Sequence, residues 1–450
     1  MTDSTTSRQP PGTTPSAPKV SSTYSHSRFG TLFSRHLPDY SGEYPVGALD
    51  VEFPIEKQTI GSFRHKKLKT DDPVGIEIDT VLFTLFYPCV VSPSESKGTV
   101  WFPRAASTVK GFLQMAGMEN SILRRLAYVG ALPAVHGLKF PTYQRAPILP
   151  PPSPSGKWPL IIFSHGVGCS RLMYTQICGE LASRGYVVAA VEHRDGTGPS
   201  ARITSEEGQV RDVDFLRWTD LNWPELEEQP KDDTTLRHDQ LKIRLAELDS
   251  TLQVIRKIVQ GRHVQPALMA SRTLDWEPWK NVVEVGDGRV CFAGHSFGGT
   301  AVIAAAADPR FTPSSIIALD PAVQRIEPWT STISCPTLSV NSEEFGHQED
   351  YERLLGVSKT VNAEKHIFTI AGATHPSFSD VFLITPGFVG SLTSLSVPPY
   401  EVFVRTLEVI ETFLRGTTES AKELESVGTP ITTMPPKPIG KPGEVFRQVE

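Results

Sequence analysis

The chain has 450 residues, of which 39% are hydrophobic and 21% charged, and its formal net charge is −6. This length is enough for one large α/β domain with insertions or for two smaller domains. The acidic balance argues against a general nucleic-acid-binding protein, and the lack of any run of 18 apolar residues argues against a transmembrane helix.

The N-terminal segment, residues 1–28, is rich in Ser, Thr and Pro, and this composition predicts disorder. It contains no apolar stretch of the kind that signal peptides have, and Thr2 stands where N-myristoylation requires Gly. The chain has five cysteines without the spacing of a zinc site or a disulfide framework. We therefore expect a cytoplasmic protein, with peripheral membrane contact left open.

From about residue 29 to 416, apolar β-branched or aromatic runs alternate with helical patterns, which predicts a mostly parallel central sheet with helices on both faces. The predicted strands are Val81–Tyr87, Thr99–Phe102, Pro159–Ser164, Tyr186–Val191, Val290–Ala293, Ser315–Leu319, Thr337–Val340 and His366–Ile370. The predicted helices are Arg171–Ser183, Thr235–Val259, Gly298–Ala307 and Pro399–Leu414.

Two long inserts, residues 103–157 and 196–234, interrupt this alternation, and each is either a substrate-binding element or passive decoration. Within the first, residues 111–129 form a candidate amphipathic helix. Its apolar stripe comprises Leu113, Ala116, Leu123, Leu126 and Ala127, with Arg124 and Arg125 beside it. Such a stripe belongs either to an interfacial, membrane-contacting helix or to a helix facing the core.

The predicted strand Pro159–Ser164 is followed by His165-Gly-Val-Gly168. This is either a simple glycine turn or the loop from which an α/β hydrolase supplies one oxyanion-hole amide, here that of Val167. Further on, Glu192-His-Arg-Asp195 follows the next strand, where it either contacts a polar head group or forms a salt-bridged support.

The strongest local signal is Gly294-His-Ser-Phe-Gly298, a G-x-S-x-G motif between an apolar strand and a helix of small residues. In this context the tight turn exposes the serine hydroxyl at its tip, so Ser296 is the predicted nucleophile. The amide of Phe297, the next residue, is the second predicted oxyanion donor. Together with this motif, the loop at 165–168 is better explained as an oxyanion loop than as a simple turn.

An acid and a histidine must follow the serine in that order. Asp320 ends the apolar strand Ser315–Leu319 and is the predicted acid, with Asp308, in a turn after a helix, as its competitor. His375 follows the strand His366–Ile370 and is the predicted base; His347 and His366 are the alternatives. The predicted triad needs no cofactor, and the sequence has no metal-ligand motif such as H-E-x-x-H.

The residues after about 417 include five prolines, which predicts a Pro-rich C-terminal tail over 417–450. The expected organisation is thus a disordered tail (1–28), one catalytic domain (29–416) and this second tail.

Several segments together resemble the platelet-activating factor acetylhydrolases of the plasma and intracellular type II kind. They are YSGEYPVGALDVEF (40–53), SHGVG (164–168), ELASRGYVVAAVEHRDGTG (180–198), GHSFGG (294–299), IIALDPAV (316–323), VNSEEF (340–345) and TIAGATHPSFSD (369–380). The resemblance implies an α/β-hydrolase fold and calcium-independent hydrolysis of the sn-2 acyl ester of phospholipids with short or oxidised sn-2 chains. It assigns nucleophile, acid and base to Ser296, Asp320 and His375, and the oxyanion donors to Val167 and Phe297.

A phospholipid substrate is therefore the leading expectation. Two other functions stay open: a carboxylesterase or dienelactone-hydrolase-like enzyme acting on small soluble esters, and an inactive lipid-binding protein on the same fold. The sequence does not determine the oligomeric state.

Overall fold

The computed structural model describes residues 30–67, 75–118, 121–152, 156–205, 208–262, 266–267 and 274–449. The segment 1–28, for which the composition predicts disorder, lies outside these residues.

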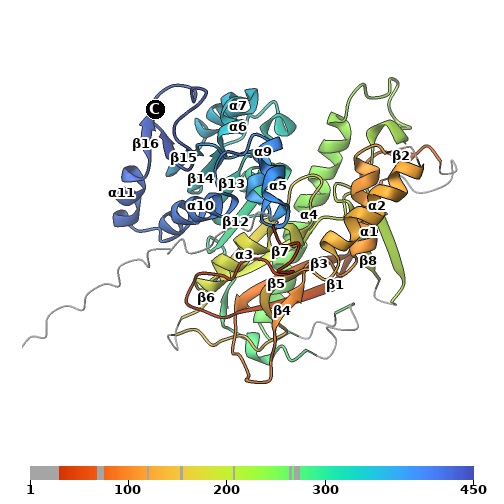
Figure 1. The fold of residues 1–450 in the computed structure, drawn as a ribbon, viewed down its shortest axis with the longest axis horizontal. Coiled ribbons are helices and arrows are strands. Elements are labelled where there is room, and N and C mark those ends of the chain that lie inside the picture. The colour runs from red at the N-terminus through yellow and green to blue at the C-terminus, as the bar shows by residue number, and fades with distance from the viewer. Residues whose placement is uncertain are drawn as a thin grey trace, which may run out of the picture.

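A 13-stranded sheet runs through the described part of the chain, in the order β16-β17-β15-β14-β13-β12-β6-β7-β3-β1-β5-β4, with β11 added beside β6 (Figure 1). Its strands are β1 Val46–Ile60, β3 Ile76–Pro88, β4 Lys97–Val100, β5 Lys139–Gln144, β6 Trp158–Ser164, β7 Val187–Glu192, β11 Val283–Glu284, β12 Val290–His295, β13 Pro313–Leu319, β14 Thr337–Ser342, β15 Lys365–Ile370, β16 Thr429–Ile431 and β17 Val445–Gln448. The central strands from β7 through β6, β12, β13 and β14 to β15 are parallel to one another.

Helices cover both faces of this sheet, because its strands are apolar on both sides. In β6, Leu160 and Ile162 belong to one hydrophobic cluster, whereas Ile161 and Phe163 belong to the other. The first cluster is completed by α4 Thr234–Val259, α5 Phe297–Ala306 and α7 Glu349–Ser358, and the second by α3 Thr175–Ser183 and α10 Pro399–Leu414. The predicted fold class is therefore confirmed.

All the predicted strands and the four helices predicted alongside them are present, with ends shifted by a few residues. The sequence patterns did not predict β1, the 15-residue strand Val46–Ile60. This strand lies beside β3 in antiparallel register, and its second half is progressively exposed. The glycine and proline within it, Gly47 and Pro54, interrupt the strand pattern that would have marked it.

The expected single helix over 111–129 is wrong, because two helices share this segment: α1 Ala105–Met115 and α2 Ser121–Val135. The first ends at Gly117, whose φ is +68°. The amides of Gly117 and Met118 donate to the carbonyls of Gln114 and Leu113, the paired bonds of a glycine-terminated helix end. The predicted apolar stripe from Leu113 to Ala127 is therefore divided between two helices and does not form one face.

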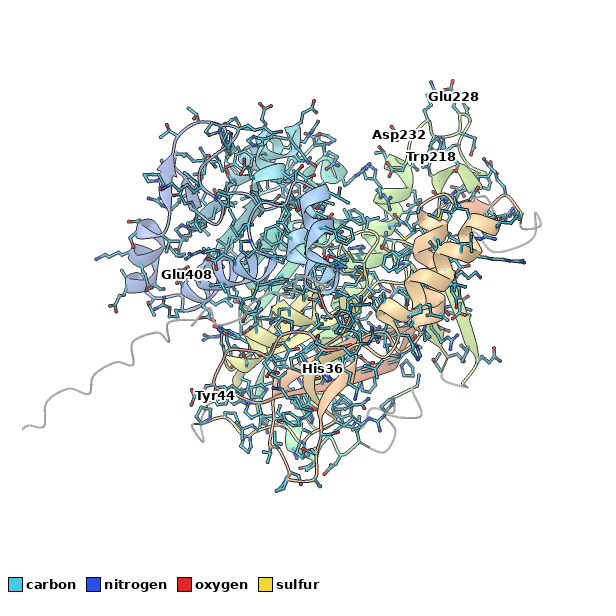
Figure 2. All side chains as sticks on the ribbon, viewed as in Figure 1. His36, Tyr44, Trp218, Glu228, Asp232 and Glu408 are labelled. Atoms are coloured by element: carbon cyan, nitrogen blue, oxygen red, sulfur yellow. The ribbon has the colours of Figure 1, made fainter. Side chains whose placement is uncertain are left out.

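The second insert, 196–234, contains a hairpin of β8 Ser200–Thr204 and β9 Val210–Asp214, and the short strand β10 Leu221–Asn222, which pairs with β2 Arg64–His65. Trp223 packs with Phe63 and Leu236 in a small hydrophobic cluster of its own. Figure 2 shows Trp218, Glu228 and Asp232 together at one end of the molecule, far from Tyr44 and Glu408.

The C-terminal segment differs from the expected tail. It forms α11 Thr418–Ser426 and the strands β16 and β17, and β17 pairs antiparallel with β15. Phe446 is buried with Ala371 and Ile439. The prolines mark turns and an edge strand, where a missing N–H costs no ladder hydrogen bond, rather than an unfolded chain.

Shorter helical segments complete the described chain: the 3₁₀ turns η1 Arg171–Tyr174, η2 Trp218–Asp220, η4 Glu277–Trp279, η5 Val323–Ile326 and η6 His375–Phe378, and the helices α6 Glu343–Gly346, α8 Val381–Ile384 and α9 Gly387–Leu392. Within the described residues, no helix combines the length and apolar character needed to cross a bilayer.

Candidate active site

Ser296 lies at the tip of the turn between β12 and α5, with φ 56° and ψ −123°, a backbone conformation that non-glycine residues seldom adopt. The neighbouring backbone leaves no room for side chains beside it. A Cβ on Gly298 would lie 2.0 Å from the carbonyl oxygen of Ser164, and one on Gly294 would lie 2.3 Å from that of Gly298. The glycines of the motif are thus required by close packing, and the serine is held in its unusual conformation.

Asp320 and His375 meet at the carboxyl edge of the same sheet, after β13 and β15 respectively. Nδ1 of His375 lies 3.1 Å from Oδ2 of Asp320. Asp320 is fully buried, and it also accepts hydrogen bonds from the amide and the hydroxyl of Ser342, at 2.7 and 2.6 Å. The hydrogen bonds from Ser342 orient the Asp320 carboxylate, which in turn contacts Nδ1 of His375. The other ring nitrogen, Nε2, is then the one available to another partner.

The surroundings of His375 favour its protonated form. Burial lowers the pKa of His375, but the hydrogen bond and charge of Asp320, with the charges of Glu344 and Asp350, outweigh it and raise the pKa above 6.5. The ring of His295 lies against that of His375, with ring centroids 4.5 Å apart and an angle of 38° between the rings. Burial and the adjacent His375 hold the pKa of His295 well below its usual range, so His295 stays neutral.

The loop at 165–168 passes directly over Ser296. A Cβ on Gly166 would approach the Cβ of Ser296 to 3.0 Å. The amide of Gly166 donates to the Tyr174 hydroxyl at 3.1 Å, and that of Gly168 donates to the carbonyl of Thr197 at 2.8 Å. These bonds fix the amides on either side of Val167.

The five predicted site residues, Ser296, Asp320, His375, Val167 and Phe297, all line one cavity of about 320 Å³. The competing residues lie elsewhere. Asp308 is paired with Arg310, and the ring of His366 contacts Glu364. His347 lies 3.7 Å from Glu343 and is not among the residues that line the cavity.

The sequence patterns did not predict two arginines that line the cavity, Arg237 from α4 and Arg325 from η5. Both donate to the carboxylate of Asp233, at 3.0 and 2.7 Å. Asp233 therefore holds both guanidinium groups at the wall of the cavity, which the side chains of Glu344 and Asp350 also line. Neither arginine belongs to a motif, and only the fold brings them beside the candidate nucleophile.

Both inserts reach the site. A Cβ on Gly168 would lie 3.0 Å from Cε of Met115, so the end of α1 abuts the loop that carries Val167. The side chain of Arg217, from the second insert, donates to the carbonyl of Gln114 in α1. The inserts therefore flank the cavity rather than decorate a remote surface.

The run Glu192–Asp195 is buried, and its charged members are ion-paired: Glu192 with Arg171, Arg194 with Glu52 and Glu247, and Asp195 with Arg244. Burial holds the pKa of His193 well below its usual range, so its contact with Glu247 is a hydrogen bond. Of the two interpretations of this run, the salt-bridged support is the one that the contacts bear out.

Among the described residues, one group of three ligand-type side chains lies within 4.8 Å: His295, Asp320 and His375. The hydrogen bonds from Ser342 and His375 to Asp320 already account for how this carboxylate is held.

Comparisons with known proteins agree with one another. The sequence model of the family described as "Platelet-activating factor acetylhydrolase, isoform II" matches residues 30–426. The chain is 32% identical to a chicken (Gallus gallus) platelet-activating factor acetylhydrolase over 254 residues, 54% of this chain and 57% of that protein. It is 29% identical to the guinea pig (Cavia porcellus) protein of the same name over 329 residues, 72% of this chain and 69% of that protein. The match thus spans little more than half of the chicken protein.

Among solved structures, a ferulic acid esterase from Streptomyces cinnamoneus superposes with a TM-score of 0.53 at 20% identity, covering 85% of this chain and 94% of that one. This likeness concerns the fold alone.

Proposed function

The chain belongs to the platelet-activating factor acetylhydrolase family, isoform II, and from this membership we propose that it hydrolyses the sn-2 acyl ester of platelet-activating factor-like or short- and oxidised-chain phospholipids. The observation that carries the proposal is the cavity that Ser296, Asp320, His375, Val167 and Phe297 line together, with His375 hydrogen-bonded to Asp320.

In the proposed mechanism, Oγ of Ser296 attacks the ester carbonyl while Nε2 of His375 takes its proton. The amides of Val167 and Phe297 donate to the oxyanion, and Asp320 stabilises the imidazolium. The imidazolium then protonates the leaving lysophospholipid oxygen, and a water molecule, activated by His375, releases the acyl group from Ser296. Every step uses side chains and amides of the chain, so we propose that hydrolysis needs no calcium.

Arg237 and Arg325 support a phospholipid over a neutral ester. Guanidinium groups bind phosphate oxygens with paired N–H donors. Both arginines line the cavity that holds Ser296, and they share a single carboxylate, that of Asp233. We propose that they face the phosphodiester of the bound substrate.

Contact with a lipid surface is proposed for α2. Four apolar side chains of this helix are mostly exposed: Ile122, Leu123, Leu126 and Val129. Such a face suits a helix lying in a membrane interface. The five cysteines, which form no disulfide, are compatible with the expected cytoplasmic location.

The nucleophile is tested by covalent labelling. A fluorophosphonate probe should label the wild-type chain, and Ser296→Ala should abolish both labelling and hydrolysis, lowering kcat by on the order of 10⁴ or more. An exposed serine such as Ser94 provides the control, since Ser94→Ala should label like wild type. Labelling of Ser296→Ala would exclude the proposed nucleophile.

The substrate class is tested by comparing phosphatidylcholines that differ only in the sn-2 chain with p-nitrophenyl acetate, each with and without EDTA. We expect hydrolysis of acetyl and short oxidised chains to exceed that of long chains, with no effect of EDTA. Arg237→Gln should raise KM for the phospholipid by about tenfold, the order expected for one charge-assisted contact, and leave p-nitrophenyl acetate unaffected. Equal losses on both substrates would remove the phosphate role, and hydrolysis of p-nitrophenyl acetate alone would favour the small-ester enzyme.

A further inference from the structure

Arg244 of α4 is a fully buried arginine beneath the candidate site. Its Nε donates to Oδ2 of Asp195 at 2.8 Å, and a terminal nitrogen donates to Oγ1 of Thr197 at 2.8 Å. Its other terminal nitrogen donates to the carbonyl of His165. The guanidinium thus ties the segment after β7 to the first residue of the 165–168 loop.

The carbonyl of His165 is one anchor of that loop. Others are the bond from the Gly166 amide to Tyr174, the bond from the Gly168 amide to Thr197, and the bond from the His193 amide to Nε2 of His165. Two of these bonds occupy the amides flanking Val167. The loop is therefore held on both sides of the amide that we propose binds the oxyanion.

The same guanidinium also contacts the second oxyanion element. Its central carbon lies 4.6 Å from the centre of the Phe297 ring, a cation–π contact in a fully buried setting. Phe297 is the first residue of α5, and its amide belongs to the unpaired N–H groups that begin a helix. One side chain therefore touches both elements that carry the proposed donors.

Asp195 holds the guanidinium of Arg244 in its orientation. Burial by itself raises the pKa of this carboxyl, but Arg244, His193 and the Thr197 hydroxyl hold it at about 2. The carboxylate is thus ionised, and the planar fork of the arginine satisfies Asp195, Thr197 and His165 together. Lysine offers no such fork.

We infer that Arg244, oriented by Asp195, is a positioning residue that fixes the spacing between the amides of Val167 and Phe297. The inference rests on the proposed function, because it concerns the oxyanion hole of that reaction. Arg244 touches no substrate; it acts through the His165 carbonyl and the Phe297 ring. An oxyanion hole whose two amides are fixed in this way stabilises the transition state more strongly than it stabilises the bound ester.

The test compares Arg244→Lys with Arg194→Lys. Arg194 is the matched control, because it is equally buried and ion-paired, with Glu52 and Glu247, but its side chain contacts neither the 165–168 loop nor Phe297. Both variants should lose thermal stability. Only Arg244→Lys should lower kcat, by about 10²-fold, the loss expected when a reacting group is displaced by about 1 Å, with KM changed less than about threefold.

A second readout separates positioning from destabilisation. Affinity for a trifluoromethyl ketone, which forms a tetrahedral oxyanion on the serine, should fall in parallel with kcat for Arg244→Lys and stay unchanged for Arg194→Lys. Thr197→Val removes one acceptor of the guanidinium but keeps the carbonyl that binds Gly168, and should give a smaller loss of the same kind.

Equal kcat losses for Arg244→Lys and Arg194→Lys, or unchanged ketone affinity in the Arg244 variant, would overturn the inference. A wild-type chain without esterase activity would instead refute the proposed function, so the two failures are distinct.

Discussion

At the scale of single residues, the pH response of the proposed base depends on a few neighbours. His375 faces the carboxylates of Asp320, Glu344 and Asp350 and the neutral ring of His295. Its raised pKa means that the neutral form, which alone can accept the serine proton, is lost as the pH falls through a value above 6.5. We therefore expect the acidic limb of kcat/KM to lie above the pKa of an ordinary histidine.

Glu344→Gln tests this arrangement. It removes one charge that raises the pKa of His375 but keeps an oxygen for the hydrogen bond from the His375 amide, so the acidic limb should move to lower pH. Glu349→Gln is the control, because Glu349 is largely exposed and pairs with Arg353. The measurement is the pH profile of kcat/KM for both variants. Identical profiles would show that Glu344 does not act on the base.

The site residues that could be predicted are those that lie next to a recognisable sequence pattern, such as a glycine-rich turn or an apolar strand. Ser296 lies in a tight turn with required glycines, and Asp320 and His375 follow buried strands. Their convergence on one cavity agrees with that expectation. Arg237, Arg325 and Arg244 could not be predicted, because they lie on the faces of helices or turns that look ordinary until α4 and η5 are packed against the site.

At the scale of elements, the segment 103–135 shows how one residue changes an interpretation. Gly117, in the left-handed region, ends α1 and leaves α2 as a separate helix with its own exposed apolar face. A helical pattern that runs through a glycine reads as continuous, because glycine is tolerated inside helices at moderate cost. The sequence pattern therefore could not show that α1 lies against the site whereas α2 exposes apolar side chains to solvent.

The exposed face of α2 can be tested with vesicles. Leu126 and Val129 are 66% and 68% exposed, so replacing both by Ser should leave folding intact. If they enter a lipid interface, binding to phosphatidylcholine vesicles should weaken by on the order of tenfold for each side chain. Hydrolysis of p-nitrophenyl acetate should not change.

Val210→Ser is the control for this experiment, since Val210 is also exposed but lies in the β8–β9 hairpin. Equal vesicle binding by the wild-type chain and the α2 variant would exclude this helix from the interface.

At the scale of the whole molecule, the C-terminal segment completes the sheet beside the proposed base. The amide of Ala371 donates to the carbonyl of Glu444, and that of Gly443 donates to Ala371, both at 2.9 Å. Ala371 opens the loop that leads from β15 to His375. The proline content of the segment concealed this role, because composition alone cannot show that a short apolar strand has an edge to pair with.

Phe446→Ala should therefore lower the free energy of unfolding by about 3 kcal/mol, the usual cost of removing a buried phenylalanine ring. Thr429→Ala, at an exposed position of the neighbouring strand β16, should change it by less than about 0.5 kcal/mol. Denaturant unfolding measures both. Equal stability of the two variants would mean that the segment adds nothing to the fold.

The buried ion pairs beneath the site also bear on how this protein can evolve. Inside the fold Arg194 pairs with Glu247 and Arg244 pairs with Asp195, so replacing one partner alone leaves a buried charge without its counter-charge. Substitutions here should accumulate in compensating sets, whereas exposed positions on α2 can drift singly. Among descendants of a common ancestor, Arg244 and Asp195 should covary, and the lipid-facing surface should diverge first.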